Sequence, residues 1–323
     1  MYLLIHKIVL NTLILSCRVV FGIPYDLAAQ LNVRLPLCTS LAASASTSGV
    51  YNFAPIERLM LPINIMSLEK TRKILVALDF DHTVIDGNSD IHITHLCPSG
   101  EVPDDIKEKF SETGWTHYMG AIFEYLYSHG LYEKDLKQSI NEIPLTEGMA
   151  ELFKFLEHEL FEVIIISDSN SMFIDYAIEK NNLGNVIDKV YTNPAEYDHT
   201  GKLTIKFYHT QDWCKLSTEN LCKGHILEEH VKNAQDNVEF SHILYVGDGS
   251  NDLCPSLRLA EKDFVFPRKQ YSLWKKLKKL GCLDNEETDL ELKAKIVEWS
   301  SGIEVLDVCK QLERERFQPK ESK

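Results

Sequence analysis

Three short apolar runs, each followed at once by polar residues, constrain the fold of this chain more than any other feature. They are Ile74–Leu78, Val163–Ile166 and Ile243–Val246. Runs of Val, Ile and Leu without alternating polar residues are typical of parallel strands that helices cover on both faces. Sheets of this kind bind ligands at the carboxyl ends of their strands. The sequence therefore predicts a Rossmann-like, doubly wound parallel α/β fold whose polar strand ends meet in one crevice.

The first run is followed by Asp79-Phe80-Asp81-His82-Thr83, a D-x-D-x-T pattern. Alternate residues of an extended chain point to the same side, so Asp79 and Asp81 are expected to project together. Asp79 could then attack phosphorus, Asp81 could transfer the proton of the leaving oxygen, and Thr83 could contact the phosphate. Two acids before a turn are also common in loops, so the functional interpretation depends on the other two runs.

The second run ends at Ser167, and the third is followed by Gly247-Asp248-Gly249-Ser250-Asn251-Asp252. In this order hhhhDxDxT, hhhhS and GDGxND resemble motifs I, II and IV of the haloacid-dehalogenase-type phosphohydrolases. The strings DFDHTVIDGNSD, IIISDSNSMFID, YTNP, NLCKG, YVGDGSNDLCP and FPRKQY resemble the family of phosphoethanolamine/phosphocholine phosphatases and pyridoxal-phosphate phosphatases. The resemblance extends from about Lys73 to about Gly302.

Charge repulsion at such a site predicts two cationic partners. A carboxylate cannot approach a dianionic phosphoryl group unless a metal ion and a lysine neutralise the site. Mg²⁺ prefers hard oxygen ligands, and we expect them to be Asp79, the backbone carbonyl of Asp81, and Asp248. Asp252 is expected outside the ligand shell, where it would hold the lysine or a metal-bound water. Ser167 would bind the transferring phosphate oxygens.

The lysine itself has two candidates. The resemblance implies that Lys223, in the NLCKG string, is the motif III lysine. The alternative is Lys202, in a β-hairpin expected from Tyr197 to Tyr208.

Two further acids are candidates for contacts with the substrate. The resemblance implies that Asp90 and Asp168 contact the non-phosphate part, where a carboxylate suits an amine, a choline or a hydroxyl. The alternative is structural: Asp90 would cap a helix, and Asp168 would accept hydrogen bonds from loop amides.

The stretch between the first two polar clusters is far longer than a βαβ crossover requires. Aromatic and apolar residues recur there at helical spacing from Trp115 to Leu126, which predicts a helical cap at 90–144. Thr146 is expected to begin the helix that returns the chain to the sheet. The predicted domains are an extension at 1–65, a phosphatase core at 66–89 and 145–310, the cap, and a charged tail at 311–323.

Composition and charge restrict the partners. The chain has a formal charge of −14, and residues 1–65 contain four basic against two acidic residues, so the remainder has 30 − 46 = −16. An acidic domain argues against nucleic acid or an anionic membrane as the main partner. The partner that the motifs indicate is a small phosphate ester, as substrate. The oligomeric state does not follow from the sequence.

The compartment depends on two features. The cysteines outside the first 65 residues form no C-x-x-C pair, which is typical of buried thiols in a reducing, cytoplasmic setting. Residues 1–65 could instead be a signal-like segment, an organellar transit peptide, or an upstream extension that precedes Met66. If residues 1–22 act as a signal peptide, the protein is secreted.

A zinc site is a further possibility. Cys214 and Cys222 lie near His209 and His225, although their spacing matches no standard ligand pattern.

The sequence thus predicts a magnesium-dependent phosphomonoesterase that forms an aspartyl-phosphate. Pyridoxal 5'-phosphate is the expected substrate, with phosphoethanolamine or phosphocholine as the alternative. A non-catalytic phosphate- or metal-binding regulator is the alternative of another class. Dehalogenase chemistry is disfavoured by the acid at Asp81.

Overall fold

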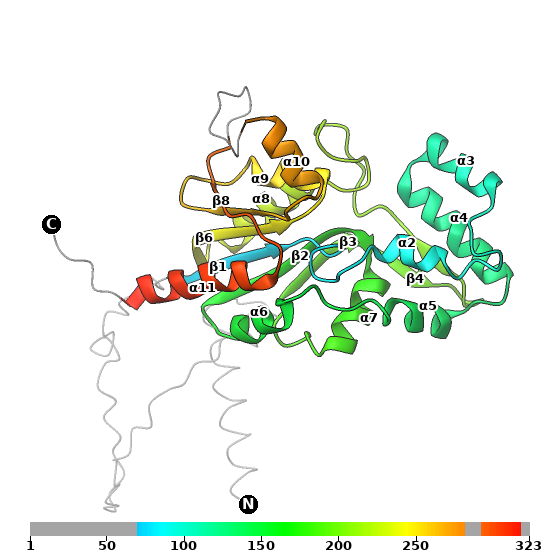
Figure 1. Ribbon diagram of the computed structural model, residues 1–323, viewed down its shortest axis with the longest axis horizontal. Coiled ribbons are helices and arrows are strands. Elements are labelled where there is room, and N and C mark those ends of the chain that lie inside the picture. Colours follow the sequence, from blue (N-terminus) through cyan, green and yellow to red (C-terminus); the bar gives the residue numbers. More distant parts are fainter. Residues whose placement is uncertain (1–69, 282–291, 318–323) are drawn as a thin grey trace, which may run out of the picture. The chain divides into compact units, whose positions relative to one another are not determined.

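A computed structural model describes residues 70–281 and 292–317, which all belong to one compact unit, Asn64–Lys323. Its centre is a six-stranded sheet in the order β3-β2-β1-β6-β7-β8, and every neighbouring pair is parallel. The predicted α/β fold is confirmed (Figure 1). The strands are β1 (Thr71–Leu78), β2 (Phe161–Asn170), β3 (Lys189–Asn193), β6 (Val238–Gly247), β7 (Phe264–Pro267) and β8 (Lys295–Ile296).

Helices cover both faces of the sheet (Figure 1). One face is covered by α6 (Met149–Leu156), α7 (Ser171–Asn181) and α11 (Gly302–Phe317), and the other by α8 (Lys223–Ala234), α9 (Leu253–Ser256) and α10 (Ser272–Lys279). Strand β1 divides its side chains between two hydrophobic clusters, with Val76 and Leu78 in one and Leu75 and Ala77 in the other. This burial on both sides explains why the strand sequence lacks polar alternation.

The insertion between β1 and β2 is helical, as predicted. It lies beyond the carboxyl ends of the strands and is drawn in cyan and green in Figure 1. A two-stranded antiparallel hairpin, β4 (Ala195–Tyr197) with β5 (Leu203–Ile205), packs against its longest helix and confirms the expected hairpin. The insertion contains α2 (Ser89–Thr94), α3 (Asp104–Thr113), α4 (Trp115–Ser128) and α5 (Glu133–Ile140).

Three boundaries differ from the sequence prediction. Helix α6 begins at Met149 and not at Thr146, because Gly148 precedes it with φ of 76° and packs against Gly302 at the start of α11. A Cβ on Gly302 would lie 2.6 Å from the Gly148 carbonyl oxygen, so the two helix starts approach each other closely only with glycines there. The helix that the sequence predicts after Lys223, at 226–231, is longer and begins at Lys223 itself as α8, and α11 continues through residues 311–317 of the predicted tail.

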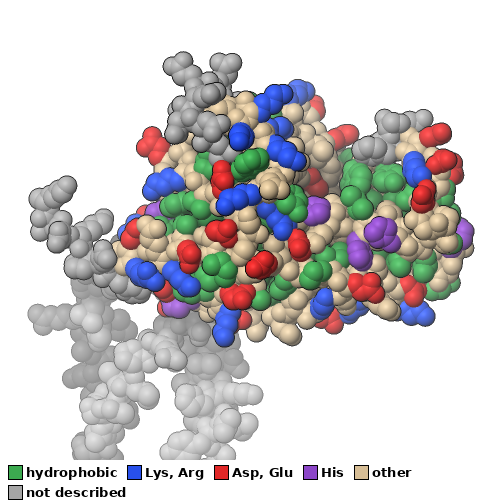
Figure 2. Space-filling view, in the orientation of Figure 1, with side chains coloured by type: hydrophobic (Ala, Val, Ile, Leu, Met, Phe, Trp, Pro, Cys, Tyr) green, Lys and Arg blue, Asp and Glu red, His purple; other side chains and the backbone are tan. Residues whose placement is uncertain are grey.

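Charged side chains of both signs are mixed over the face of the molecule drawn in Figure 2, and lysines gather over α10. Within residues 70–281 and 292–317, no helix combines the length and the apolar character needed to cross a membrane. The predictions for residues 1–65, and for Cys282, fall outside the described residues.

Candidate active site

A pocket of about 620 Å³ opens where β1, β2 and β6 end. Parallel strands place their carboxyl ends at one edge of the sheet, so polar residues that are far apart in the sequence meet there. The pocket is lined by six of the nine candidate residues: Asp79, Asp81, Asp90, Ser167, Asp168 and Asp248.

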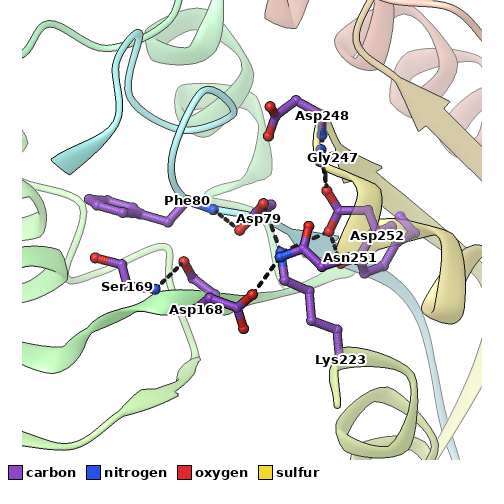
Figure 3. Close-up of polar contacts among 12 residues, drawn as sticks. Asp79, Phe80, Asp168, Ser169, Lys223, Gly247, Asp248, Asn251 and Asp252 are labelled. Carbon is purple, nitrogen blue, oxygen red and sulfur yellow. Dashed lines mark hydrogen bonds and ion pairs between the residues drawn. The ribbon is translucent and has the colours of Figure 1, made fainter. Parts of the chain in front are cut away.

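Asp79, directly after β1, is buried and oriented by two donors. Its Oδ1 accepts a hydrogen bond of 2.7 Å from the Phe80 amide, and its Oδ2 lies 2.7 Å from Lys223 Nζ (Figure 3). The same Nζ lies 2.8 Å from Asp252 Oδ1. Lys223 is only 1% exposed, so a single buried ammonium group joins two carboxylates beneath the pocket.

Asp252 uses both carboxylate oxygens within the protein. Besides Lys223, Oδ1 accepts from the Tyr245 hydroxyl at 2.7 Å, while Oδ2 accepts from the amides of Asp248 and Gly249 at 3.1 and 2.8 Å. Burial alone would lower the pKa of Lys223, but the charges of Asp252 and Asp79 outweigh it and hold that pKa above its usual value. Asp252 therefore positions the lysine and shapes the loop after β6.

Three carboxylates at this end of the sheet form a group that fits a divalent cation. Oxygens of Asp79, Asp248 and Asp252 all lie within 4.8 Å of one another, and Lys223 supplies a single positive charge. Burial, then the charges of Asp79 and Asp252, raises the pKa of Asp248 to about 8. Burial likewise raises the pKa of Asp79, despite the opposing effect of Lys223. Hard oxygen donors with excess negative charge are those that Mg²⁺ prefers.

Asp81 lies in the loop after β1. The Ser89 amide donates to its Oδ1 at 2.7 Å. Burial, followed by repulsion from Asp90, raises the pKa of Asp81 to about 7. A carboxyl group with such a pKa can both donate and accept a proton near neutral pH.

Asp90 and Asp168 line the pocket. Each has one buried carboxylate oxygen, Oδ1, without a hydrogen-bond partner among the described residues. Trp115 Nε1 donates to Asp90 Oδ2 at 2.7 Å, and Asn251 Nδ2 donates to Asp168 Oδ2 at 2.6 Å. Burial raises the pKa of Asp90 to about 6 and also raises the pKa of Asp168.

The structural alternative for Asp90 is wrong. Asn88 is the N-cap of α2, and its side chain accepts from the Ile91 amide at 2.8 Å. Asp90 lies two residues after this N-cap, within the first turn of α2, and is not its capping residue.

Ser167 and Thr83 differ in position. Ser167 lines the pocket, and its hydroxyl accepts from the Ser169 amide at 3.2 Å. Thr83 is fully buried and does not line the pocket, and its Oγ1 has no hydrogen-bond partner among the described residues. Lys202, the alternative lysine, stays in the turn of the hairpin, where its amide donates to Asp198.

Sequence reasoning missed several residues that complete the site. Arg268 donates to the His82 carbonyl at 2.5 Å and to Asp86 at 2.8 Å, and so fixes the loop that contains Asp81. Arg268 stands in FPRKQY, a string that resembles the family, but no local pattern links it to that loop. Tyr245 was missed as well: its hydroxyl donates to Asp252, but in the sequence it is one more apolar residue of a strand.

A parallel sheet whose first strand leads into D-x-D-x-T, with a lysine bound to the first of these acids, is the arrangement of a haloacid-dehalogenase-type phosphatase. The family described as "Putative Phosphatase" matches residues 74–312, and this chain belongs to that family. It is therefore a phosphomonoester hydrolase, as the sequence predicted.

The chain is similar to two groups of named phosphatases. "Pyridoxal phosphate phosphatase PHOSPHO2" of Bos taurus is 40% identical over 246 residues, which cover 75% of this chain and all of that protein. "Phosphoethanolamine/phosphocholine phosphatase" of Gallus gallus is 34% identical and covers 76% of this chain and 91% of its own length. A solved structure titled "Phospho-Aspartyl Intermediate Analogue of Phosphoserine phosphatase" is 21% identical with a TM-score of 0.48, and covers 74% of this chain and 99% of that one.

Proposed function

We propose that this protein hydrolyses the phosphate ester of a small metabolite, with pyridoxal 5'-phosphate as the preferred substrate, through an aspartyl-phosphate on Asp79. The observation that supports this most is the pairing of Asp79 with the buried Lys223 on the floor of the pocket. The lysine orients one carboxylate oxygen, and the Phe80 amide orients the other. A carboxylate fixed in this way is a nucleophile with a defined direction of attack.

Asp81 is the proposed general acid and base. With a pKa of about 7, it is partly protonated at neutral pH and can protonate the leaving alkoxide. The resulting carboxylate then takes a proton from the water that cleaves the acyl-phosphate. The Ser89 amide, which donates to Oδ1, leaves Oδ2 for this proton transfer.

Phosphate binding is proposed for Ser167 and the neighbouring backbone. The Ser167 hydroxyl reaches the pocket at the end of β2, at the same edge of the sheet as Asp79. When bound, Mg²⁺ held by Asp79, Asp248 and the backbone carbonyl of Asp81 would neutralise the charge of phosphate and carboxylates. Thr83 is proposed to stabilise the loop after β1, which contains Asp79 and Asp81, because its side chain is fully buried and does not line the pocket.

Asp90 and Asp168 are proposed to recognise the leaving group. Both residues line the pocket, each has one buried carboxylate oxygen without a hydrogen-bond partner among the described residues, and Trp115 adds an aromatic ring to the pocket wall. Pyridoxal offers a pyridine nitrogen, a hydroxyl and a planar ring, and a carboxylate is a suitable partner for the pyridine nitrogen when it is protonated. A cavity of about 620 Å³ is of the size that holds a small molecule.

A second candidate is phosphoethanolamine or phosphocholine. The carboxylates of Asp90 and Asp168 would attract the cationic head of either, and Trp115 could contact a quaternary ammonium through its ring face. The relatives with these printed substrates are less similar to this chain than those named for pyridoxal phosphate.

A panel of phosphate-release assays tests the proposal. Pyridoxal 5'-phosphate, phosphoethanolamine, phosphocholine, phosphoserine and p-nitrophenyl phosphate would each be supplied with and without Mg²⁺. We expect the highest kcat/KM for pyridoxal 5'-phosphate and no turnover without the metal. Preference for an amino-alcohol ester would favour the second candidate, and no phosphate release from any ester would favour a regulatory protein.

The recognition roles need a separate comparison. Asp90→Ala and Asp168→Ala are expected to raise KM for the preferred ester by about tenfold or more, since a charged hydrogen bond contributes about 1.5–3 kcal/mol. The kcat/KM for p-nitrophenyl phosphate, which lacks the recognised groups, should change much less. Asp105→Ala, at an exposed acid of α3, is the matched control. Equal losses for both substrates would assign Asp90 and Asp168 to structure or to general catalysis.

A further inference from the structure

A cluster of three thiols lies outside the hydrophobic core and beside the floor of the pocket. Cys214 comes from the loop before α8, Cys222 is the N-cap of α8, and Cys254 is in α9. Their sulfur atoms all lie within 4.8 Å of one another. Cys254 Sγ is 3.4 Å from Cys214 Sγ and 3.8 Å from Cys222 Sγ.

A fourth donor completes the group. The Ser217 hydroxyl is 3.4 Å from Cys214 Sγ and 3.3 Å from Cys222 Sγ. In a tetrahedral zinc site with Zn–S bonds of about 2.3 Å, two sulfurs are about 3.8 Å apart, and a sulfur and an oxygen slightly closer. Four of the distances among these donors, from 3.3 to 3.8 Å, are therefore near the edges of a zinc tetrahedron.

These thiols differ from the other described buried cysteines. Cys97 and Cys309 pack as apolar side chains within a hydrophobic cluster, which is the usual role of a buried free thiol. Neither Cys222 nor Cys254, although almost fully buried, belongs to either hydrophobic cluster. The contacts of their sulfur atoms include one another, Cys214 and the Ser217 hydroxyl, as expected for metal ligands.

We propose that Cys214, Cys222 and Cys254 bind a structural zinc ion, with Ser217 at the fourth position, and that this ion fixes residues 211–222 beside the pocket. Thiolates are soft donors, which select zinc over the hard Mg²⁺ that suits the aspartates. The site is thus chemically distinct from the carboxylate group of the active site.

Two neighbouring residues shape the surroundings of the cluster. Arg258 lies near Cys254 and is ion-paired with Glu228, so its positive charge would offset only part of the net charge of −1 that three thiolates and Zn²⁺ would have. A Cβ at Gly224 would lie 2.6 Å from Cys254 Sγ, so only glycine lets α8 approach this sulfur.

One buried side chain shapes the ligand loop. The Gln211 amide nitrogen donates to the carbonyls of Cys214, Ser217 and Thr218, and its oxygen accepts from the Cys214 amide at 2.8 Å. This arrangement turns the loop so that Cys214 and Ser217 face the same side, as outer hydrogen bonds do for many metal ligands.

The histidines that the sequence suggested as ligands have other contacts. His209 Nε2 accepts the Cys222 amide at 2.9 Å, and the ring of His225 packs against the rings of His209 and Trp213. The third ligand is instead Cys254, which lies 32 residues after Cys222 in the chain.

The position of the cluster gives the ion a role in the active site. Cys222 directly precedes Lys223, and Cys254 follows Asp252 by two residues, so the ion would brace both members of a buried ion pair. The same loop contributes Lys215, Leu216 and Asn220 to the pocket wall. Loss of zinc is therefore expected to loosen the wall and to raise KM more than it lowers kcat.

Metal content of the full-length protein tests the proposal. After purification with zinc and removal of loosely bound metal, we expect about one zinc per chain by mass spectrometry. Cys214→Ala should contain almost none while remaining folded by circular dichroism, and its KM should rise roughly tenfold. Cys97→Ala removes a buried thiol elsewhere in the chain and should retain the zinc.

Cobalt substitution identifies the type of ligand by absorption spectroscopy, without measuring zinc content. Co²⁺ bound by thiolates gives a strong charge-transfer absorption in the near ultraviolet, whereas Co²⁺ bound by carboxylates does not. We expect this band in the wild-type protein and in Asp248→Asn, and its loss in Cys214→Ala. The proposal is overturned if no thiolate band forms, if zinc content is unchanged in Cys214→Ala, or if peptide mapping of the native protein finds a Cys214–Cys254 disulfide.

Discussion

The buried ammonium group of Lys223 joins Asp79, the proposed nucleophile, to the loop after β6, and its removal tests this arrangement. In Lys223→Met, the carboxylates of Asp79 and Asp252 would remain buried, and among the described lysines no other forms an ion pair with either of them. Removal of one partner from a buried ion pair costs about 3–5 kcal/mol, which lowers the ratio of folded to unfolded protein by roughly 10²–10⁴. Methionine keeps most of the side-chain volume of lysine, so the loss of stability would come from the missing charge and not from a cavity.

Activity should fall in parallel. Loss of a preorganised donor at the reacting centre costs about 10²–10³ in kcat. The free energy of unfolding would be measured by urea denaturation, and kcat from phosphate release with p-nitrophenyl phosphate. Because protonation can relieve the unpaired carboxylates, the loss of stability should be smaller at pH 5 than at pH 8.

Two controls distinguish the effect of losing the Lys223 ion pairs from the effect of removing a positive charge anywhere in the protein. Lys202→Met, at the half-buried lysine of the hairpin turn, should change stability by only about 0.5 kcal/mol. Asp252→Asn in the Lys223→Met background should recover part of the lost stability, because it removes an uncompensated charge. A loss below about 1 kcal/mol for Lys223→Met, or an equal loss of activity in Lys202→Met, would refute the role of this ion pair.

Two further predictions concern the acids of the pocket. Asp79→Asn should keep the fold but lower the rate of phosphate release by roughly 10⁴ or more, because an amide cannot form the acyl-phosphate; substantial turnover by well-folded Asp79→Asn would exclude covalent catalysis. The metal-free protein should lose stability as the pH rises from about 4 to about 8. In the folded protein the pKa is about 7 for Asp81 and about 8 for Asp248, against about 3.9 for an aspartate in the unfolded chain. The folded state therefore binds more protons than the unfolded state over this range, and raising the pH favours unfolding. Thermal unfolding would measure this, with Mg²⁺ raising the midpoint more at pH 8 than at pH 5.5; a midpoint that rises with pH in the metal-free protein would contradict the assigned burial.

Structural features that are encoded by residues close together in the sequence could be predicted from the sequence alone. The strand at Ile74–Leu78 and the acids after it are encoded within ten residues, because burial on both faces leaves a continuous apolar run and the strand end presents alternate side chains. The helical cap and the hairpin follow from equally local patterns. The phosphatase class was predicted from the resemblance of the three polar strand ends, in their order, to motifs of known phosphohydrolases.

Features that depend on contacts between distant segments required the tertiary structure. The choice of Lys223 over Lys202 rests on a contact between residues 144 positions apart, since Lys223 Nζ meets Asp79 only when α8 packs against the sheet. The sequence prediction placed the start of α6 too early. Its true start depends on the close contact between Gly148 and Gly302 of α11, and helix propensity does not include contacts with another helix.

The cysteine cluster gives the clearest contrast between the two sources. The sequence placed Cys214 and Cys222 near two histidines, because those residues are neighbours in the chain. Only the folded protein brings Cys254 to them, while the His209 ring is already occupied by the Cys222 amide. Local sequence thus predicted the candidate nucleophile, Asp79, and its motifs indicated the phosphatase class. The packing of α8 and α9 beside β6 decided which lysine, acid and thiols lie together, because these contacts exist only once the sheet is assembled.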